Sequence, residues 1–208
     1  MICPSALKKT IPVGWTCCNK PTGTQVVSDF LKGRVAEMCY ADITGQAKDL
    51  SKKIKVIIDE VQGKTCVSSF YGFELSRDAV MEKLKKRQSL IEIYTDVKTQ
   101  DGTVFRVFVM AVTSRQQNQL KVNSYAKSSQ IKAMRKAVIQ KLNEIVAEKD
   151  TKSFAYSVIM GDVGNELEKV SYKLIKGVKL QIYKMKTIRR GALDIKRLKD
   201  EAKNANEK

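Results

Sequence analysis

The sequence predicts an α+β fold. Three observations predict it: strand-like segments fill the first half of the chain, a block of helical periodicity follows, and a strand pattern returns near residue 180. With 208 residues, of which 43% are apolar and 29% charged, the chain has the composition of a globular protein with a real hydrophobic core.

The N-terminal segment differs in composition from the rest of the chain. All three prolines lie within the first 30 residues, which predicts an extended arm or an early strand over residues 1–30. We expect a single α+β body over residues 31–200 and a frayed tail over residues 201–208.

Alternating apolar and polar residues predict six strands, with a polar connector at 44–49. The strands are expected at residues 34–43, 54–61, 66–75, 90–97, 104–112 and 178–188. The fourth and fifth form the clearest hairpin, because Asp101-Gly102 supplies turn residues between them. The polar segment 114–119 follows as a loop or a partner-facing segment.

Helical periodicity is strongest over residues 128–148. Apolar residues at steps of three or four predict one buried face there, made of Ile131, Met134, Val138, Leu142 and Ile145. Lys132, Arg135 and Lys136 fall on the opposite side, so we expect a long basic amphipathic helix.

Shorter helices are predicted around this long one. Ser76 is a candidate N-cap, with Asp78 in the first turn and an apolar stripe of Ala79, Val80 and Leu84 running toward Arg87. Further helices are expected at 152–160, at 162–170 and from Asp194 onward.

The positive charge is concentrated in two segments. The chain has 39 Lys and Arg against 22 Asp and Glu, a formal charge of +17. Residues 169–199 contribute +10 and residues 121–147 contribute +5. Such density favours a polyanionic partner, although lysines on a solvated helix face or protecting an edge strand give the same pattern. Tyrosines in or beside these segments could stack on bases or belong to the core: Tyr125, Tyr172 and Tyr183.

The sequence offers no catalytic machinery. It contains no histidine, which excludes Ser/His/Asp and Cys/His nucleophilic sites and histidine-containing zinc sites. No Walker A or GxGxxG motif occurs. We therefore expect a protein that is not an enzyme and has no cofactor, no bound metal and no small-molecule substrate.

Cysteine usage and the N-terminus favour the cytoplasm. The five cysteines are odd in number and form no C-x-x-C pair, which favours reduced thiols over a disulfide framework or a zinc ribbon. Adjacent Cys17 and Cys18 could in principle bind metal or oxidise. No secretory or transit pattern opens the chain, and no apolar run approaches the roughly 20 residues that span a bilayer, so no membrane partner is expected.

A series of short motifs runs in order over roughly residues 25–190. The motifs lie at 28–34, 41–43, 59–64, 70–72, 90–92, 96–102, 115–119 and 124–136. The last block, Ser-Tyr-Ala-Lys-Ser-Ser-Gln-Ile-Lys-Ala-Met-Arg-Lys, is the most specific. In this order and spacing the motifs resemble the archaeal and eukaryotic small-subunit ribosomal protein family called eS-one, also S-three-Ae.

The resemblance implies a structural constituent of the small ribosomal subunit with a curved, mainly antiparallel sheet. It implies binding to ribosomal RNA on the platform near the mRNA exit region, next to other platform proteins, and a role in translation and subunit assembly. It also implies a cytoplasmic ribosomal location, with assembly in the nucleus or nucleolus if the source is eukaryotic.

Nine cations are the candidate RNA-binding residues. The family match makes five of them plausible RNA contacts, and the other four belong to the basic segment 169–199. The nine are Lys64, Lys127, Lys132, Arg135, Lys136, Lys184, Lys186, Arg189 and Arg190. A different class of function is an extraribosomal basic scaffold for acidic protein partners, which would retain its partners after nuclease treatment.

Overall fold

The computed structural model describes residues 14–19, 23, 26–63 and 65–191. Within it the chain divides into two compact units, which we treat separately. The N-terminal unit comprises the described residues up to Glu74, and the C-terminal unit comprises Leu75–Ala192. The single body expected over 31–200 stays a prediction, and the expected helix from Asp194 and the tail at 201–208 lie outside the described residues.

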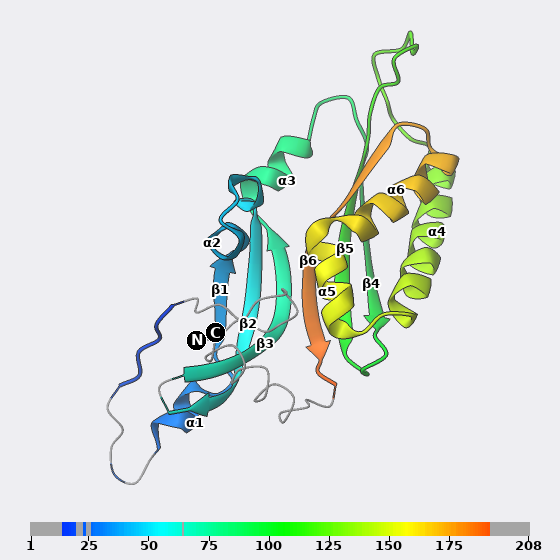
Figure 1. Cartoon of the computed structure of the whole chain (residues 1–208). Helices are drawn as coiled ribbons and strands as arrows, with labels where there is room; N and C mark the ends of the chain where they lie inside the picture. The colour runs from blue at the N-terminus through cyan, green and yellow to red at the C-terminus, as the bar shows by residue number, and fades with distance from the viewer. Residues whose placement is uncertain (1–13, 20–22, 24–25, 64, 192–208) are drawn as a thin grey trace. The chain divides into compact units, whose positions relative to one another are not determined.

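The N-terminal unit is a three-stranded sheet in the order β1-β2-β3 (Figure 1). Its elements are α1 (Val27–Leu31), β1 (Val35–Cys39), α2 (Tyr40–Thr44), the short 3₁₀ helix η2 (Ala47–Asp49), β2 (Lys52–Gln62) and β3 (Thr65–Leu75). β1 pairs antiparallel with β2, and only two residues separate β2 from β3, a connection that joins antiparallel strands.

The strand predicted at 34–43 is wrong in its second half. β1 ends at Cys39 and the chain turns directly into α2, where Tyr40 is buried. Gly45 then ends the helix in the left-handed conformation, with φ 71°. The polar connector predicted at 44–49 is this helix end followed by η2.

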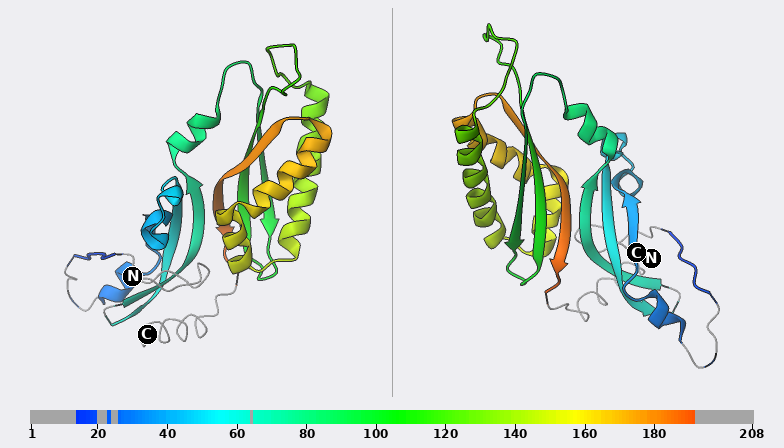
Figure 2. Two further views of the ribbon diagram at one scale, coloured as in Figure 1. Left: turned by 45° about the horizontal axis from the view of Figure 1, so that its top comes forward. Right: turned by 180° about the vertical axis from the view of Figure 1, so that it is seen from behind.

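The C-terminal unit places three helices on one face of its antiparallel strands, which pair in the sheet order β6-β5-β4 (Figures 1 and 2). Its elements are α3 (Arg77–Lys83), β4 (Leu90–Lys98), β5 (Val104–Thr113), α4 (Ser128–Ala147), α5 (Thr151–Met160), α6 (Asp162–Leu174) and β6 (Val178–Arg189). This mixture of antiparallel strands and helices confirms the predicted α+β class.

The hairpin predicted around Asp101-Gly102 is confirmed. β4 and β5 pair from Leu90 opposite Val112 to Lys98 opposite Val104. Gly102 has a φ of 78°, which its lack of a side chain allows in the turn.

The core of the C-terminal unit lies between this sheet and helices α4, α5 and α6. Phe105, Val107 and Val109 alternate along β5 and are fully buried, as are Met134, Val138 and Leu142 on α4. Phe154 of α5 packs against Phe105 with ring centroids 6.1 Å apart. Each such side chain contributes about 1.5–3 kcal/mol of hydrophobic stabilisation, which fixes α4 on the sheet.

Helix α3 departs from its prediction. Ser76 caps it as expected, since its Oγ accepts a hydrogen bond from the Ala79 amide at 3.3 Å. However, no residue of α3 is buried, and Leu84 lies beyond its end with 38% exposure, so the predicted apolar stripe does not form a core contact.

Candidate nucleic-acid interface

The C-terminal unit holds most of the positive charge. Residues 75–192 contain 24 Lys and Arg against 11 Asp and Glu, a net +13 of the chain's +17. Two stretches of this unit lack acids altogether: residues 102–143 and residues 169–192 each carry eight cations and no carboxylate. The charge is therefore a property of one unit rather than of the whole surface.

Three loops meet at one end of the C-terminal unit and are joined by hydrogen bonds. The Ser124 amide donates to the Arg87 carbonyl at 2.9 Å, and the Ala126 amide donates to Ser89 Oγ at 3.1 Å. The Ser114 amide donates to the Gly177 carbonyl at 2.8 Å. These bonds join the loop before β4, the loop after β5 and the turn before β6.

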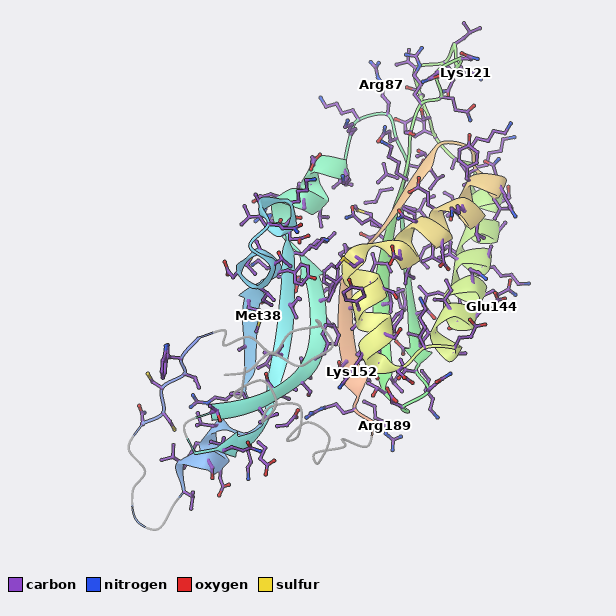
Figure 3. All side chains as sticks on the ribbon, viewed as in Figure 1. Met38, Arg87, Lys121, Glu144, Lys152 and Arg189 are labelled. Carbon is purple, nitrogen blue, oxygen red and sulfur yellow. The ribbon has the colours of Figure 1, made fainter. Side chains whose placement is uncertain are left out.

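We call this assembly the basic end, defined as segments 83–89, 114–127 and 173–179. Its sequence contains no acidic residue. All of its cations are exposed, and none has a carboxylate within 4.0 Å among the described residues. They are Lys83, Lys85, Lys86, Arg87, Arg115, Lys121, Lys127, Lys173, Lys176 and Lys179. Figure 3 shows Arg87 and Lys121 projecting from this end.

The long loop of the basic end is held in shape by its own side chains. The Arg115 guanidinium donates from Nε and Nη2 to the Gln119 carbonyl, at 3.1 and 2.9 Å. Gln119 Nε2 in turn donates to the carbonyls of Lys121 and Asn123. Beyond this clamp Leu120 is 96% exposed, so the loop presents an apolar tip beside cations.

Arg87 carries the one left-handed backbone among the described non-glycine residues, with φ 65°. Such a conformation is unusual for a bulky residue and is held in place by the surrounding structure. Here the bond from the Ser124 amide and the parallel bridge between Gln88 and Ser124 hold it. These backbone contacts hold Arg87 next to Ser124 of the long loop.

The described residues contain no cluster of cysteines and carboxylates that could hold a metal ion. Nor does any helix within the described ranges have the length and apolar content needed to cross a bilayer. What the described surface offers is a set of unpaired cations, which suits a phosphate backbone.

A comparison with protein-family models matches residues 2–191 to the Ribosomal S3Ae family. The chain belongs to the ribosomal S3Ae family. It is therefore a ribosomal protein of the small subunit, a structural constituent of the cytoplasmic ribosome that acts in translation. Its partners are ribosomal RNA and other ribosomal proteins. The family resemblance inferred from the motifs is confirmed.

Four of the predicted RNA-binding residues of this ribosomal protein lie together. Lys127 belongs to the basic end, and Lys132, Arg135 and Lys136 follow it on the exposed side of the first half of α4. The basic end therefore continues directly into α4.

The other predicted residues lie elsewhere. Lys184, Lys186, Arg189 and Arg190 follow the second half of β6 and the residue beyond it. At about 3.3 Å per residue, Arg189 lies roughly 33 Å along the strand from Lys179 of the basic end. Lys186 Nζ sits 5.8 Å from the Phe108 ring, a cation–π contact on the face of the sheet opposite α4, α5 and α6. Lys64 lies outside the described residues.

Sequence reasoning missed the segment 83–87. Four of its five residues are cations. The net charge of the wider segment 76–106 is nevertheless close to that of an ordinary protein surface, because Glu92, Asp96 and Asp101 also fall within it. A five-residue window would have found the run. Its place beside the long loop depends on the fold.

Proposed function

We propose that this ribosomal protein binds ribosomal RNA mainly through the basic end and the first half of α4. The observation that carries the proposal is the meeting of three acid-free loops, which puts ten cations without a described carboxylate partner in one place. Uncompensated cations at this density repel one another until an anion neutralises them. Phosphates do so with release of counterions, which makes the affinity depend steeply on salt.

In this proposal α4 acts as a basic amphipathic helix. Met134, Val138 and Leu142 anchor it to the sheet, and its cations on the other side face RNA. The cations at the end of β6 form a separate second contact, and Lys64 a further one.

The motif series also supports a proposal about the place of the protein within the subunit. We propose that it lies on the platform near the mRNA exit region, beside other platform proteins, and supports subunit assembly. In a eukaryotic source this assembly takes place in the nucleus or nucleolus. The ordered motifs, above all residues 124–136, support this position.

Sucrose-gradient fractionation of a tagged chain tests the proposal. We expect the chain in small subunits and polysomes at moderate salt, and absence from both would contradict it. Partners that survive nuclease treatment off the ribosome would instead favour the scaffold alternative.

A charge-reversal pair locates the contact. Lys121→Glu with Lys127→Glu should weaken binding to purified small-subunit RNA and reduce incorporation into subunits. The matched control is Lys48→Glu with Lys98→Glu, two exposed lysines outside the basic end. Equal loss in both pairs would show that net charge matters and the basic end does not.

A further inference from the structure

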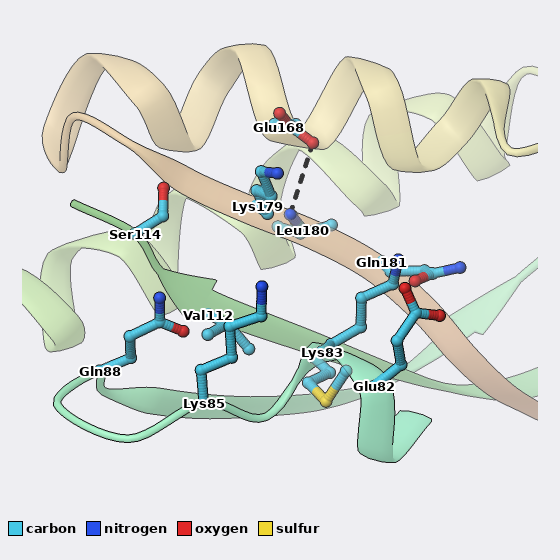
Figure 4. A pocket seen from close by; sticks show the side chains of 11 residues that line it. Glu82, Lys83, Lys85, Gln88, Val112, Ser114, Glu168, Lys179, Leu180 and Gln181 are labelled. Carbon is cyan, nitrogen blue, oxygen red and sulfur yellow. Dashed lines mark hydrogen bonds between the residues drawn. The ribbon is translucent and has the colours of Figure 1, made fainter. Parts of the chain in front are cut away.

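A pocket of about 340 Å³ lies at the edge of the basic end, within the C-terminal unit (Figure 4). One wall is the segment from the end of α3 to Gln88, and the other is formed by β5 and β6. In Figure 4 the side chains of Lys85 and Gln88 rise from the loop toward β6, which carries Lys179. The ribosomal family assignment gives this pocket no role.

The floor of the pocket is apolar. Met110 and Val112 alternate with the core residues of β5, so they face away from helices α4, α5 and α6. They are nonetheless only 4% and 7% exposed. They form the apolar base of a polar opening, whereas Leu180, which pairs with Ala111, turns its side chain to the other face.

The rim of the pocket is cationic. Lys83, Lys85 and Lys179 line it, and none of their ammonium groups lies within 4.0 Å of a described carboxylate. Two carboxylates also line it: Glu82, and Glu168, whose Oε2 accepts a hydrogen bond from the Leu180 amide at 3.4 Å. The lining therefore carries a net charge of +1, and its three ammonium groups are available to an anion.

Amide side chains complete the lining. Gln88 and Gln181 are half-buried on opposite walls, and each can both donate and accept a hydrogen bond. An apolar floor, amide walls and a cationic rim match, in order, the face of a nucleobase, its polar edge and its phosphate.

We propose that this pocket binds a single ribonucleotide extruded from ribosomal RNA, with its base on Met110 and Val112 and its phosphate on the rim lysines. The volume is at the lower end for small-molecule sites, enough for one nucleotide and too small for a duplex. A base buried in a helix cannot reach the floor, so the nucleotide must leave the stack, as at bulges and loops. The inference rests on the proposed function, because the basic end delivers the RNA.

A bulged RNA hairpin tests the proposal. The probe is a short stem with one bulged 2-aminopurine, compared with the same stem fully paired, each titrated with the full-length chain at moderate salt. The fluorescence of 2-aminopurine is quenched by stacking, and the pocket lining includes no aromatic residue. We expect emission from the bulged probe to rise on binding, and an unchanged emission at saturation would overturn the proposal.

Two charge-matched double variants separate the pocket from the surrounding surface. Lys85→Ala with Lys179→Ala should abolish the rise in emission at saturation, whereas Lys86→Ala with Arg87→Ala should weaken binding but keep the full rise once the probe is saturated. Both remove two cations from the basic end, but only the first pair lines the pocket. The same loss in both variants would overturn the proposal, and circular dichroism checks that both are folded.

Two further arms separate the possible failures. If the paired stem binds the wild-type chain but the bulged probe shows no rise, only the pocket proposal fails; if neither stem nor purified small-subunit RNA binds, the proposed function fails. A third outcome is that adenosine monophosphate binds and Lys85→Ala weakens its binding, while the emission of the bulged probe does not change. The pocket would then bind a free nucleotide, and the proposal that the nucleotide belongs to ribosomal RNA would be overturned.

Discussion

Gly177 is the residue at which the basic end tolerates no side chain. Its φ is 80°, and a Cβ there would lie 2.8 Å from the Ser114 carbonyl oxygen. This close approach lets the Ser114 amide donate to the Gly177 carbonyl and join the long loop to the turn before β6. The glycine thus holds two cationic segments together.

We predict that Gly177→Ala destabilises the protein more than Gly102→Ala does. Both positions have a left-handed φ, which costs a side chain about 1–2 kcal/mol, but a Cβ at Gly102 meets nothing within 4 Å. Urea unfolding of the two variants measures the difference. If both variants lost the same free energy of unfolding, the backbone around Ser114 would be able to move away from the added Cβ without cost.

Glu37 joins the strands of the N-terminal unit electrostatically. Its carboxylate lies 3.0 Å from Lys53 Nζ and 3.4 Å from Lys55 Nζ, and Lys55 also contacts Glu74 of β3 at 2.8 Å. The hydrogen bond from Lys53 is the main cause of a lowered pKa of Glu37. The same bond raises the pKa of Lys53, and Glu74 raises that of Lys55.

The lowered pKa of Glu37 predicts an acid-dependent loss of stability. The contribution of the carboxylate is fully present above its unfolded pKa of about 4.3 and is lost as the pH falls through the lower folded value. Glu37→Gln should therefore lose less stability than the wild type between about pH 6 and pH 3. Urea unfolding of both proteins across this pH range measures the difference. If the free energy of unfolding fell equally in the variant and the wild type, the stabilising role of the Glu37 carboxylate would be contradicted.

At the scale of elements, the two sides of α4 differ in burial. Leu142 is fully buried against the sheet, whereas Lys132, Arg135 and Lys136 are exposed. Truncating the first should affect folding, and truncating the others should affect RNA binding.

We predict that Lys132→Ala with Arg135→Ala and Lys136→Ala leaves the free energy of unfolding nearly unchanged. RNA affinity should fall, and the slope of log affinity against log salt should decrease by about 3, one unit for each phosphate contact. Leu142→Ala is the converse control, costing about 2–5 kcal/mol of stability while the folded protein keeps its salt slope. An unchanged slope in the triple variant would place the RNA on another face.

Helices and strands that are determined by residues close together in the chain could be predicted from the sequence. The β4–β5 hairpin depends on an Asp-Gly turn between two alternating strands, and α4 on apolar residues spaced by three or four. The end of β1 at Cys39 could not be predicted, because Tyr40 continues an apolar pattern that suits strand and helix alike.

At the scale of the whole molecule, the distribution of charge makes salt act in two opposite directions. The C-terminal unit carries +13, and no carboxylate of the described part of the chain lies within 4.0 Å of a cation of its basic end. Self-repulsion among them opposes folding and is screened by salt, whereas attraction to RNA is weakened by the same screening.

We predict that raising the salt concentration from about 50 mM to about 500 mM, across which the Debye length shortens severalfold, increases the thermal midpoint of the free protein. Over the same range the stabilisation conferred by added small-subunit RNA should disappear. Differential scanning fluorimetry with and without RNA measures both trends. A midpoint of the free chain that falls with salt would show that attractive pairs outweigh the repulsion.

The sequence by itself determined the family, the amount of charge, the hairpin and the apolar face of the long helix, because these depend on residue identity, order and short-range spacing. The tertiary structure alone decided that segments 83–89, 114–127 and 173–179 form one cationic surface with a pocket at its edge. The physical reason is that their meeting depends on strand pairing and on hydrogen bonds between residues up to 63 positions apart, such as Ser114 and Gly177. No local pattern records these contacts.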